Sequence, residues 1–74
     1  MAVEVEVFGQ LLPGVQRRQT LLLEGVTTAE QVALRLGLDP EAVGLVVIDG
    51  VQSELDAAVP PGSRLCFFPP MSGG

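Results

Sequence analysis

The sequence predicts an α+β fold in which one main helix packs across a mixed β-sheet of four to five strands. Three observations support this prediction: an alternating apolar segment near the N-terminus, one helical segment with a capping signal, and an apolar segment close to the C-terminus. Two strands, one helix and then further strands describe an α+β domain. The 74 residues suffice for a single domain, which we place over residues 1–74.

The N-terminal part predicts two strands joined by a long loop. Residues 2–8 alternate with a period of two, which is typical of a half-buried strand. Residues 19–24 (QTLLLE) predict a second strand, and the turn signal Pro13-Gly14 lies between the two. The alternation places Val3, Val5 and Val7 on one face of the first strand and Glu4, Glu6 and Phe8 on the other.

The middle of the chain predicts the helix, over residues 28–36. Thr27 followed by Glu30 resembles a capping box, which satisfies backbone donors at a helix start. Gly37 is a good C-cap, and Leu38 can fold back onto the helix. One helical face carries the apolar residues at spacings of three and four, namely Ala29, Val32, Ala33 and Leu36.

The C-terminal half predicts the remaining strands. A brief turn at residues 39–41 leads to an apolar strand over residues 45–49, which ends in the hairpin-type turn Asp49-Gly50. The segment 51–59 is ambiguous; Val51 and Gln52 are candidates for a short edge strand, and Leu55 is a candidate core residue. Residues 64–68 predict the last strand, after the turn at Pro60-Pro61-Gly62.

Composition excludes several function classes. The net charge of −5 disfavours nucleic acid, which binds clustered cations, and no apolar segment is long enough to span a membrane. Without histidine, and with one cysteine, neither a metal site nor a Ser/His or Cys/His pair is expected. We expect no cofactor. The single cysteine and the absence of a signal peptide favour the cytoplasm.

The last six residues, 69–74, predict an extended, flexible C-terminal tail. Pro69 and Pro70 end the last strand, because proline cannot donate to a β-ladder. The tail continues through Met71 and Ser72 to a terminal pair of glycines, Gly73 and Gly74, and it spans at most about 20 Å. Such a tail suits insertion of a bare carboxylate into a pocket of another protein.

The C-terminal residues Phe67 to Gly74 (FFPPMSGG) resemble the ending of the MoaD/ThiS family of sulfur carriers. The strand at residues 45–48 with its turn at Asp49-Gly50, and the Phe8-Gly9 pair, resemble other parts of the same family. The resemblance is closest to MoaD, the small subunit of molybdopterin synthase. It implies a β-grasp (ubiquitin-like) fold, with a chain that is not catalytic alone but supplies sulfur to a larger partner.

The resemblance also implies the chemistry of the tail. A ubiquitin-activating-type enzyme would adenylate the carboxylate of Gly74, and the adenylate would become a thiocarboxylate. The molybdopterin synthase large subunit would then receive this group for transfer to a pterin precursor. Gly73 lacks a Cβ and can thread a narrow channel. The resemblance gives Gly73 and Gly74 the reactive role, and it assigns Pro69, Pro70, Met71 and Ser72 to partner binding.

The open face of the sheet predicts a docking surface beside the tail. If Val7 and Phe67 face the helix, then Phe8 and Phe68 lie on the opposite face, where exposed rings would bind the partner. The alternative is that the loop of residues 9–18 covers one or both rings, so that they pack within the chain and do not bind a partner. We interpret Cys66 as a small, semi-buried strand residue rather than a sulfur relay.

We interpret the arginines near the sheet as solvated surface residues without a specific role. We interpret Arg64 as a solubilising arginine at a strand end, and Arg17-Arg18 as part of a solvated loop. The alternatives are that Arg64 pairs with a carboxylate of a partner, and that the other two contact an anionic substrate.

Departures from the family pattern leave the pathway open. Leu11 and Leu12 stand where the family often has an arginine. A ThiS-like carrier acting with a thiazole synthase, or a tRNA-thiolation carrier acting with a tRNA thiolase, therefore stays an alternative. Alternatives of another class are a protein modifier joined to targets through Gly74 and a β-grasp binding module with an idle tail.

Overall fold

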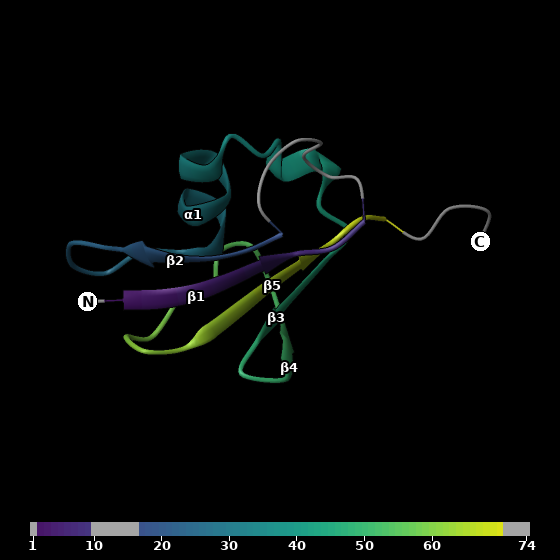
Figure 1. The fold of residues 1–74 in the computed structure, drawn as a ribbon. Helices are drawn as coiled ribbons and strands as arrows, with labels where there is room; N and C mark the ends of the chain where they lie inside the picture. The colour runs from purple at the N-terminus through teal and green to yellow at the C-terminus, as the bar shows by residue number, and fades with distance from the viewer. Residues whose placement is uncertain (1, 10–16, 71–74) are drawn as a thin grey trace.

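The computed structural model describes residues 2–9 and 17–70 (Figure 1). They form one mixed sheet, one α-helix and one short 3-10 helix. In chain order the elements are β1 (Ala2–Val7), β2 (Arg18–Leu22), α1 (Ala29–Leu36), η1 (Pro40–Ala42), β3 (Leu45–Ile48), β4 (Val51–Ser53) and β5 (Arg64–Phe68).

The sheet has five strands in the order β2-β1-β5-β3-β4. β1 pairs in parallel with β5, whereas β1–β2, β3–β5 and β3–β4 pair antiparallel. The last strand of the chain therefore lies in the middle of the sheet. The predicted α+β, β-grasp architecture is confirmed, including the short edge strand that begins at Val51.

The helix begins one residue later than the sequence predicts. Thr28, not Thr27, is the N-cap: its Oγ1 accepts from the Gln31 N–H at 3.3 Å, and its own N–H donates to Gln31 Oε1 at 3.1 Å. Thr27 is engaged elsewhere, because its carbonyl accepts from the Val59 N–H at 2.8 Å. The prediction of a box between Thr27 and Glu30 was wrong for this tertiary reason.

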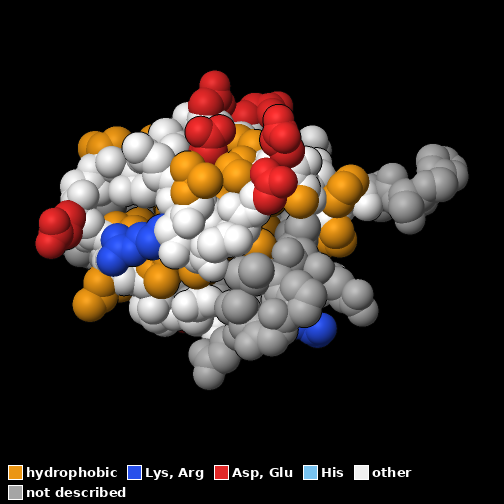
Figure 2. Space-filling view, turned by 90° about the horizontal axis from the view of Figure 1, so that it is seen from above, with side chains coloured by type: hydrophobic (Ala, Val, Ile, Leu, Met, Phe, Trp, Pro, Cys, Tyr) orange, Lys and Arg blue, Asp and Glu red, His pale blue; other side chains and the backbone are white. Residues whose placement is uncertain are grey.

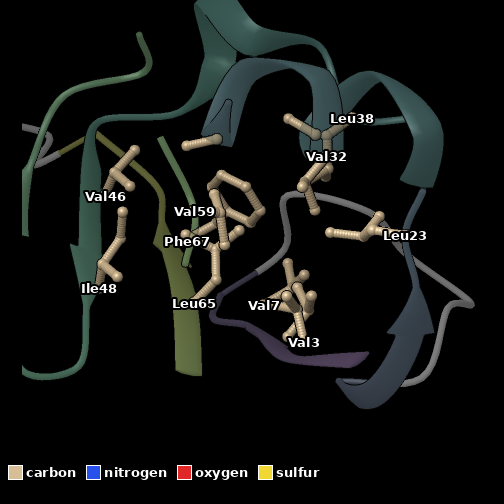
Figure 3. Close-up of a cluster of buried hydrophobic side chains, with 13 residues drawn as sticks. Val3, Val7, Leu23, Val32, Leu38, Val46, Ile48, Val59, Leu65 and Phe67 are labelled. Atoms are coloured by element: carbon tan, nitrogen blue, oxygen red, sulfur yellow. The ribbon is translucent and has the colours of Figure 1, made fainter. Parts of the chain in front are cut away.

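The hydrophobic core lies between α1 and one face of the sheet (Figure 3). The parity predicted for the strands is confirmed, because Val3 and Val5 are at most 1% exposed and Leu65 and Phe67 are fully buried. Val32 on α1 and Leu38 behind the Gly37 C-cap close the core from above. Such alternation fixes which side chains remain on the open face.

The sheet has two contrasting ends (Figure 1). β1 and β5 run in parallel toward one end, where the chain leaves β5 at Pro69. The connection from β2 to α1 lies at the opposite end, beside the turn that precedes β5. Within the described ranges, no helix combines the length and the apolar character needed to cross a membrane.

Candidate functional site

The chain leaves β5 from the centre of the sheet, held by hydrogen bonds on both sides. The Phe8 N–H donates to the Phe67 carbonyl at 2.9 Å, and the Gly44 N–H donates to the Phe68 carbonyl at 2.8 Å. β5 is therefore paired up to its last residue, immediately before Pro69. The position and direction of the chain at this point are fixed by the sheet.

Two aromatic rings lie beside this exit. Phe8 and Phe68 stack with ring centroids 4.4 Å apart and an angle of 4° between the ring planes. Both residues are half-buried, on the face opposite the helix, as strand parity predicts. We call them the Phe8–Phe68 pair. The stacking itself was missed, because sequence spacing does not reveal how β1 and β5 align; the partner-binding role stays a prediction.

Two glycines make room for the prolines that follow β5. A Cβ on Gly44 would lie 2.6 Å from Pro70 N and 2.8 Å from the Pro69 carbonyl oxygen. A Cβ on Gly9 would lie 2.7 Å from Pro69 Cγ, and Gly9 also has a positive φ of 69°. All three distances are too short for a real Cβ. The backbone of Pro69 and Pro70 therefore lies against Gly44, and the ring of Pro69 lies against Gly9, in places that a larger residue would obstruct.

The reactive end of the predicted site lies outside the described residues. This holds for Met71, Ser72, Gly73 and Gly74, whose predicted roles therefore stay predictions. Of the predicted partner-binding residues in the tail, Pro69 is half-buried and Pro70 is exposed. The described site is the base from which the tail departs.

An ion-pair cluster occupies the open face farther along the sheet. Glu6 Oε1 accepts from Arg64 Nη2 at 2.7 Å and lies 3.4 Å from Arg18 Nη2. The hydrogen bond from Arg64 lowers the pKa of the Glu6 carboxyl, aided by the charge of Arg18 and opposed by partial burial. The same bond raises the pKa of Arg64. Glu6 is only 8% exposed despite its place on the open face, where both arginines contact its carboxylate.

This cluster corrects two predictions. Arg64 is not simply a solubilising strand end, because it pairs with a carboxylate of its own chain. Arg18 lies in β2 rather than in a solvated loop. The register Glu6↔Arg18 and Glu4↔Arg64 brings these side chains together on one face, and no local sequence signal specifies that alignment.

Cys66 is a half-buried residue on the same face. Burial raises the pKa of its thiol, although Arg64 nearby acts in the opposite direction. A raised pKa keeps the thiol protonated and therefore a poor nucleophile at neutral pH. The interpretation of Cys66 as a packing residue is consistent with this environment. Among the described residues, no three His, Cys, Asp or Glu side chains gather as potential metal ligands.

Comparisons with solved structures show what the fold resembles. No family model and no curated protein matches the chain. The crystal structure of SAMP1 from Haloferax volcanii is similar, with a TM-score of 0.74 and 24% sequence identity over 100% of both chains. This likeness shows that the chain has the ubiquitin-like β-grasp fold.

Proposed function

We propose that this protein is a sulfur carrier whose C-terminal Gly74 is converted to a thiocarboxylate. The observation that supports this most directly is the anchored base of the tail. The central strand ends at Phe68, just before Pro69, with hydrogen bonds from Phe8 and Gly44 on its two sides, and two glycines accommodate the prolines. A tail that starts from a fixed point loses less conformational freedom when it enters a partner's pocket.

The chemistry follows from the terminal group. A carboxylate is ionised at neutral pH and is a poor electrophile, so it needs activation. One carboxylate oxygen of Gly74 attacks the α-phosphorus of ATP, which releases pyrophosphate and gives an acyl adenylate. Sulfide then attacks the carbonyl carbon and AMP leaves, so that the –COOH group becomes –COSH. The carrier supplies the reacting carboxyl group, and a ubiquitin-activating-type enzyme supplies the catalytic residues.

The recipient that we propose is the large subunit of molybdopterin synthase, which would transfer the sulfur to a pterin precursor. The ending from Phe67 to Gly74 supports this choice over the thiazole and tRNA pathways. The Phe8–Phe68 pair would contact the adenylating enzyme in one complex and the large subunit in the other, because the two rings present apolar area next to the tail.

The test changes only the end of the chain. The intact protein, incubated with its adenylating enzyme, ATP and sulfide, should gain about 16 Da at Gly74, since one sulfur replaces one oxygen. Deleting Gly74 moves the carboxylate by about 3.5 Å, and adding one residue turns the original carboxylate into a peptide bond. Both variants should abolish sulfur transfer, because reaction requires much tighter placement than this.

A control at the far end completes the test. Val26→Ala alters an exposed residue near α1 and should gain the same mass as the unaltered chain. All variants should keep the thermal unfolding midpoint. If the chain without Gly74 supports cofactor synthesis as well as the full chain does, the sulfur-carrier proposal is wrong and a binding module with an idle tail becomes the better account.

The likeness to SAMP1, a ubiquitin-like small archaeal modifier, favours a second candidate function. In this alternative the activated Gly74 forms an amide with a lysine of a target protein. The chain contains no lysine, so it could not extend itself into lysine-linked chains. Conjugates that survive denaturing electrophoresis and carry the mass of the whole chain would identify a modifier. A mass gain of about 16 Da without conjugates would identify a dedicated carrier.

A further inference from the structure

The segment between α1 and β3 lies against the prolines that follow β5. It covers residues 39–44, and we call it the 39–44 segment. Leu38, which precedes it, is buried in the core at 3% exposure, and Gly44 ends it. The Gly44 N–H donates to the Phe68 carbonyl at 2.8 Å, and a Cβ on Gly44 would lie 2.6 Å from Pro70 N. The path of the 39–44 segment therefore decides where Gly44 meets the base of the tail.

Hydrogen bonds shape this segment into the turn of η1. The Ala42 N–H donates to the Asp39 carbonyl at 2.9 Å. The Val43 N–H donates to the Pro40 carbonyl at 3.2 Å. A side chain adds to these backbone bonds, because Asp39 is the N-cap and its Oδ1 accepts from the Glu41 N–H at 3.0 Å. A 3-10 helix of three residues has few bonds to hold it, so the loss of its cap should change its shape.

The two sides of the tail base are held in different ways. On the β1 side, the Phe8 N–H donates to the Phe67 carbonyl and continues the ladder between two full strands. On the other side, Gly44 precedes β3, so its position depends on η1 as well as on the sheet. Figure 2 views the side that carries α1 and η1, where acidic side chains gather at the surface, and Asp39 is exposed. A surface side chain can therefore control this side of the tail base without touching the core.

We propose that Asp39 is a positioning residue for the reaction at Gly74. Its side-chain oxygen holds η1 in shape, and η1 places Gly44 against Pro70. This contact sets the direction in which the tail enters the active site of the adenylating enzyme. Asp39 acts through Gly44 and does not need to touch the enzyme. This role rests on the proposed sulfur-carrier function and adds a residue to it.

Loss of the cap should redirect the tail and leave the docking surface in place. Asp39→Ala removes the acceptor of the Glu41 N–H, so that η1 can adopt other conformations. Gly44 then moves relative to Pro70, and the close contact between them passes the movement to the tail. The Phe8–Phe68 pair lies on the face opposite the helix and keeps its position. A misdirected tail on an intact docking surface should lower kcat and leave KM unchanged.

The kinetic test uses the full chain with the adenylating enzyme, ATP and sulfide. Asp39→Ala should lower kcat for the mass gain at Gly74 at least about tenfold and change KM for the carrier less than about twofold. Asp39→Asn and Asp39→Ser also place an oxygen at the N-cap, so both should restore kcat to within about threefold of the unaltered chain. Restoration by asparagine, which is uncharged, separates the cap from an attraction between the Asp39 carboxylate and the enzyme.

A second measurement follows the 39–44 segment without the enzyme. Asp39→Ala should speed hydrogen exchange of the Gly44 N–H about tenfold and leave exchange of the Phe8 N–H unchanged, because one side of the tail base is loosened. Thr28→Ala is the matched control, since it removes the N-cap oxygen of α1 at the other end of the sheet (Figure 1). It should lower the thermal unfolding midpoint but leave kcat and the Gly44 exchange rate unchanged.

Three results would overturn the proposal. The first is an Asp39→Ala chain with unaltered kcat or with unaltered exchange of the Gly44 N–H. The second is an Asp39→Asn chain that loses as much kcat as Asp39→Ala, since the charge rather than the cap would then matter. The third is an equal loss of kcat in Thr28→Ala, which would make general stability the cause. An unaltered chain that gains no mass contradicts the sulfur-carrier function itself, and the Gly44 exchange rates then report separately whether Asp39 holds the tail base.

Discussion

The two ends of the sheet are built in opposite ways. At the end where the chain leaves β5, backbone packs against backbone, as in the contact of Gly44 with Pro69 and Pro70. At the other end, around Leu22 and Val26, large apolar side chains are exposed, and the neighbouring β2 is the outer strand of the described sheet. The Gly25 turn at that end has open space where a Cβ would lie.

This difference suits the two ends to different contacts. A reactive tail needs a fixed starting point, because small displacements of a reacting group reduce the rate strongly. An outer strand keeps accessible backbone groups, which a closely packed end cannot offer. Among the described residues, the central strand β5 is paired on both sides, whereas β2 is paired with β1 alone.

We expect the largest effect, on the rate of thiocarboxylate formation, when one glycine at each end of the sheet is replaced by alanine and the two variants are compared. Gly44→Ala places a Cβ against the backbone of Pro69 and Pro70, which must shift. A shift of about 1 Å at the base of the tail should reduce the rate of thiocarboxylate formation about 100-fold. The measurement is the initial rate of mass gain with the adenylating enzyme, ATP and sulfide.

Gly25→Ala is the control for that substitution. Gly25 has a φ of 77°, so alanine there introduces backbone strain of about 1–2 kcal/mol without touching the tail. The free energy of unfolding should fall while the rate of mass gain stays the same. Equal loss of rate in both variants would mean that general stability, rather than the seating of the tail, controls the reaction.

A smaller effect is expected from the Phe8–Phe68 pair. Phe68→Ala should weaken binding of the adenylating enzyme by about 1–3 kcal/mol, because it removes apolar area at the centre of the proposed interface. Isothermal titration calorimetry measures this change. Val26→Ala, at the other end, should leave the affinity unchanged.

A double-mutant cycle tests whether the two rings act together. Phe8→Ala, Phe68→Ala and the double variant should show a coupling of about 0.5–1.5 kcal/mol in stability, as stacked aromatic pairs do. If Phe68→Ala folds and binds as tightly as the unaltered chain, then the rings serve packing alone and the docking surface lies elsewhere.

The fold was predictable from the sequence because its signals are local and periodic. The valines of β1 alternate, the apolar residues of α1 recur at helical spacing, and Asp49-Gly50 marks the β3–β4 hairpin. Parity then placed Phe8 and Phe68 on the open face before their contact was known. These features depend on residues that are neighbours in the chain.

The contacts of the site were not predictable, because they depend on how separate segments align. Gly44 looks like an ordinary residue before a strand, and its need for a missing Cβ appears only when Pro70 lies against it. The pairing of Glu6 with Arg64 joins residues 58 positions apart. The helix cap moved from Thr27 to Thr28 for the same reason, because Val59 bonds the Thr27 carbonyl.

The smallest expected effect concerns the Glu6 ion pair, which lies between the two ends. Its hydrogen bond from Arg64 lowers the pKa of Glu6 below the usual 4.5, so the folded state favours the carboxylate. The resulting stability is fully present above pH 4.5 and is lost as the pH falls through the lower, folded-state pKa. Glu6→Gln should therefore flatten the decline of the unfolding free energy between neutral and acidic pH, as measured by urea denaturation. Glu4→Gln removes an exposed carboxylate from the same face and serves as the control. Identical pH profiles for the two variants would show that the Glu6–Arg64 pair does not stabilise the fold.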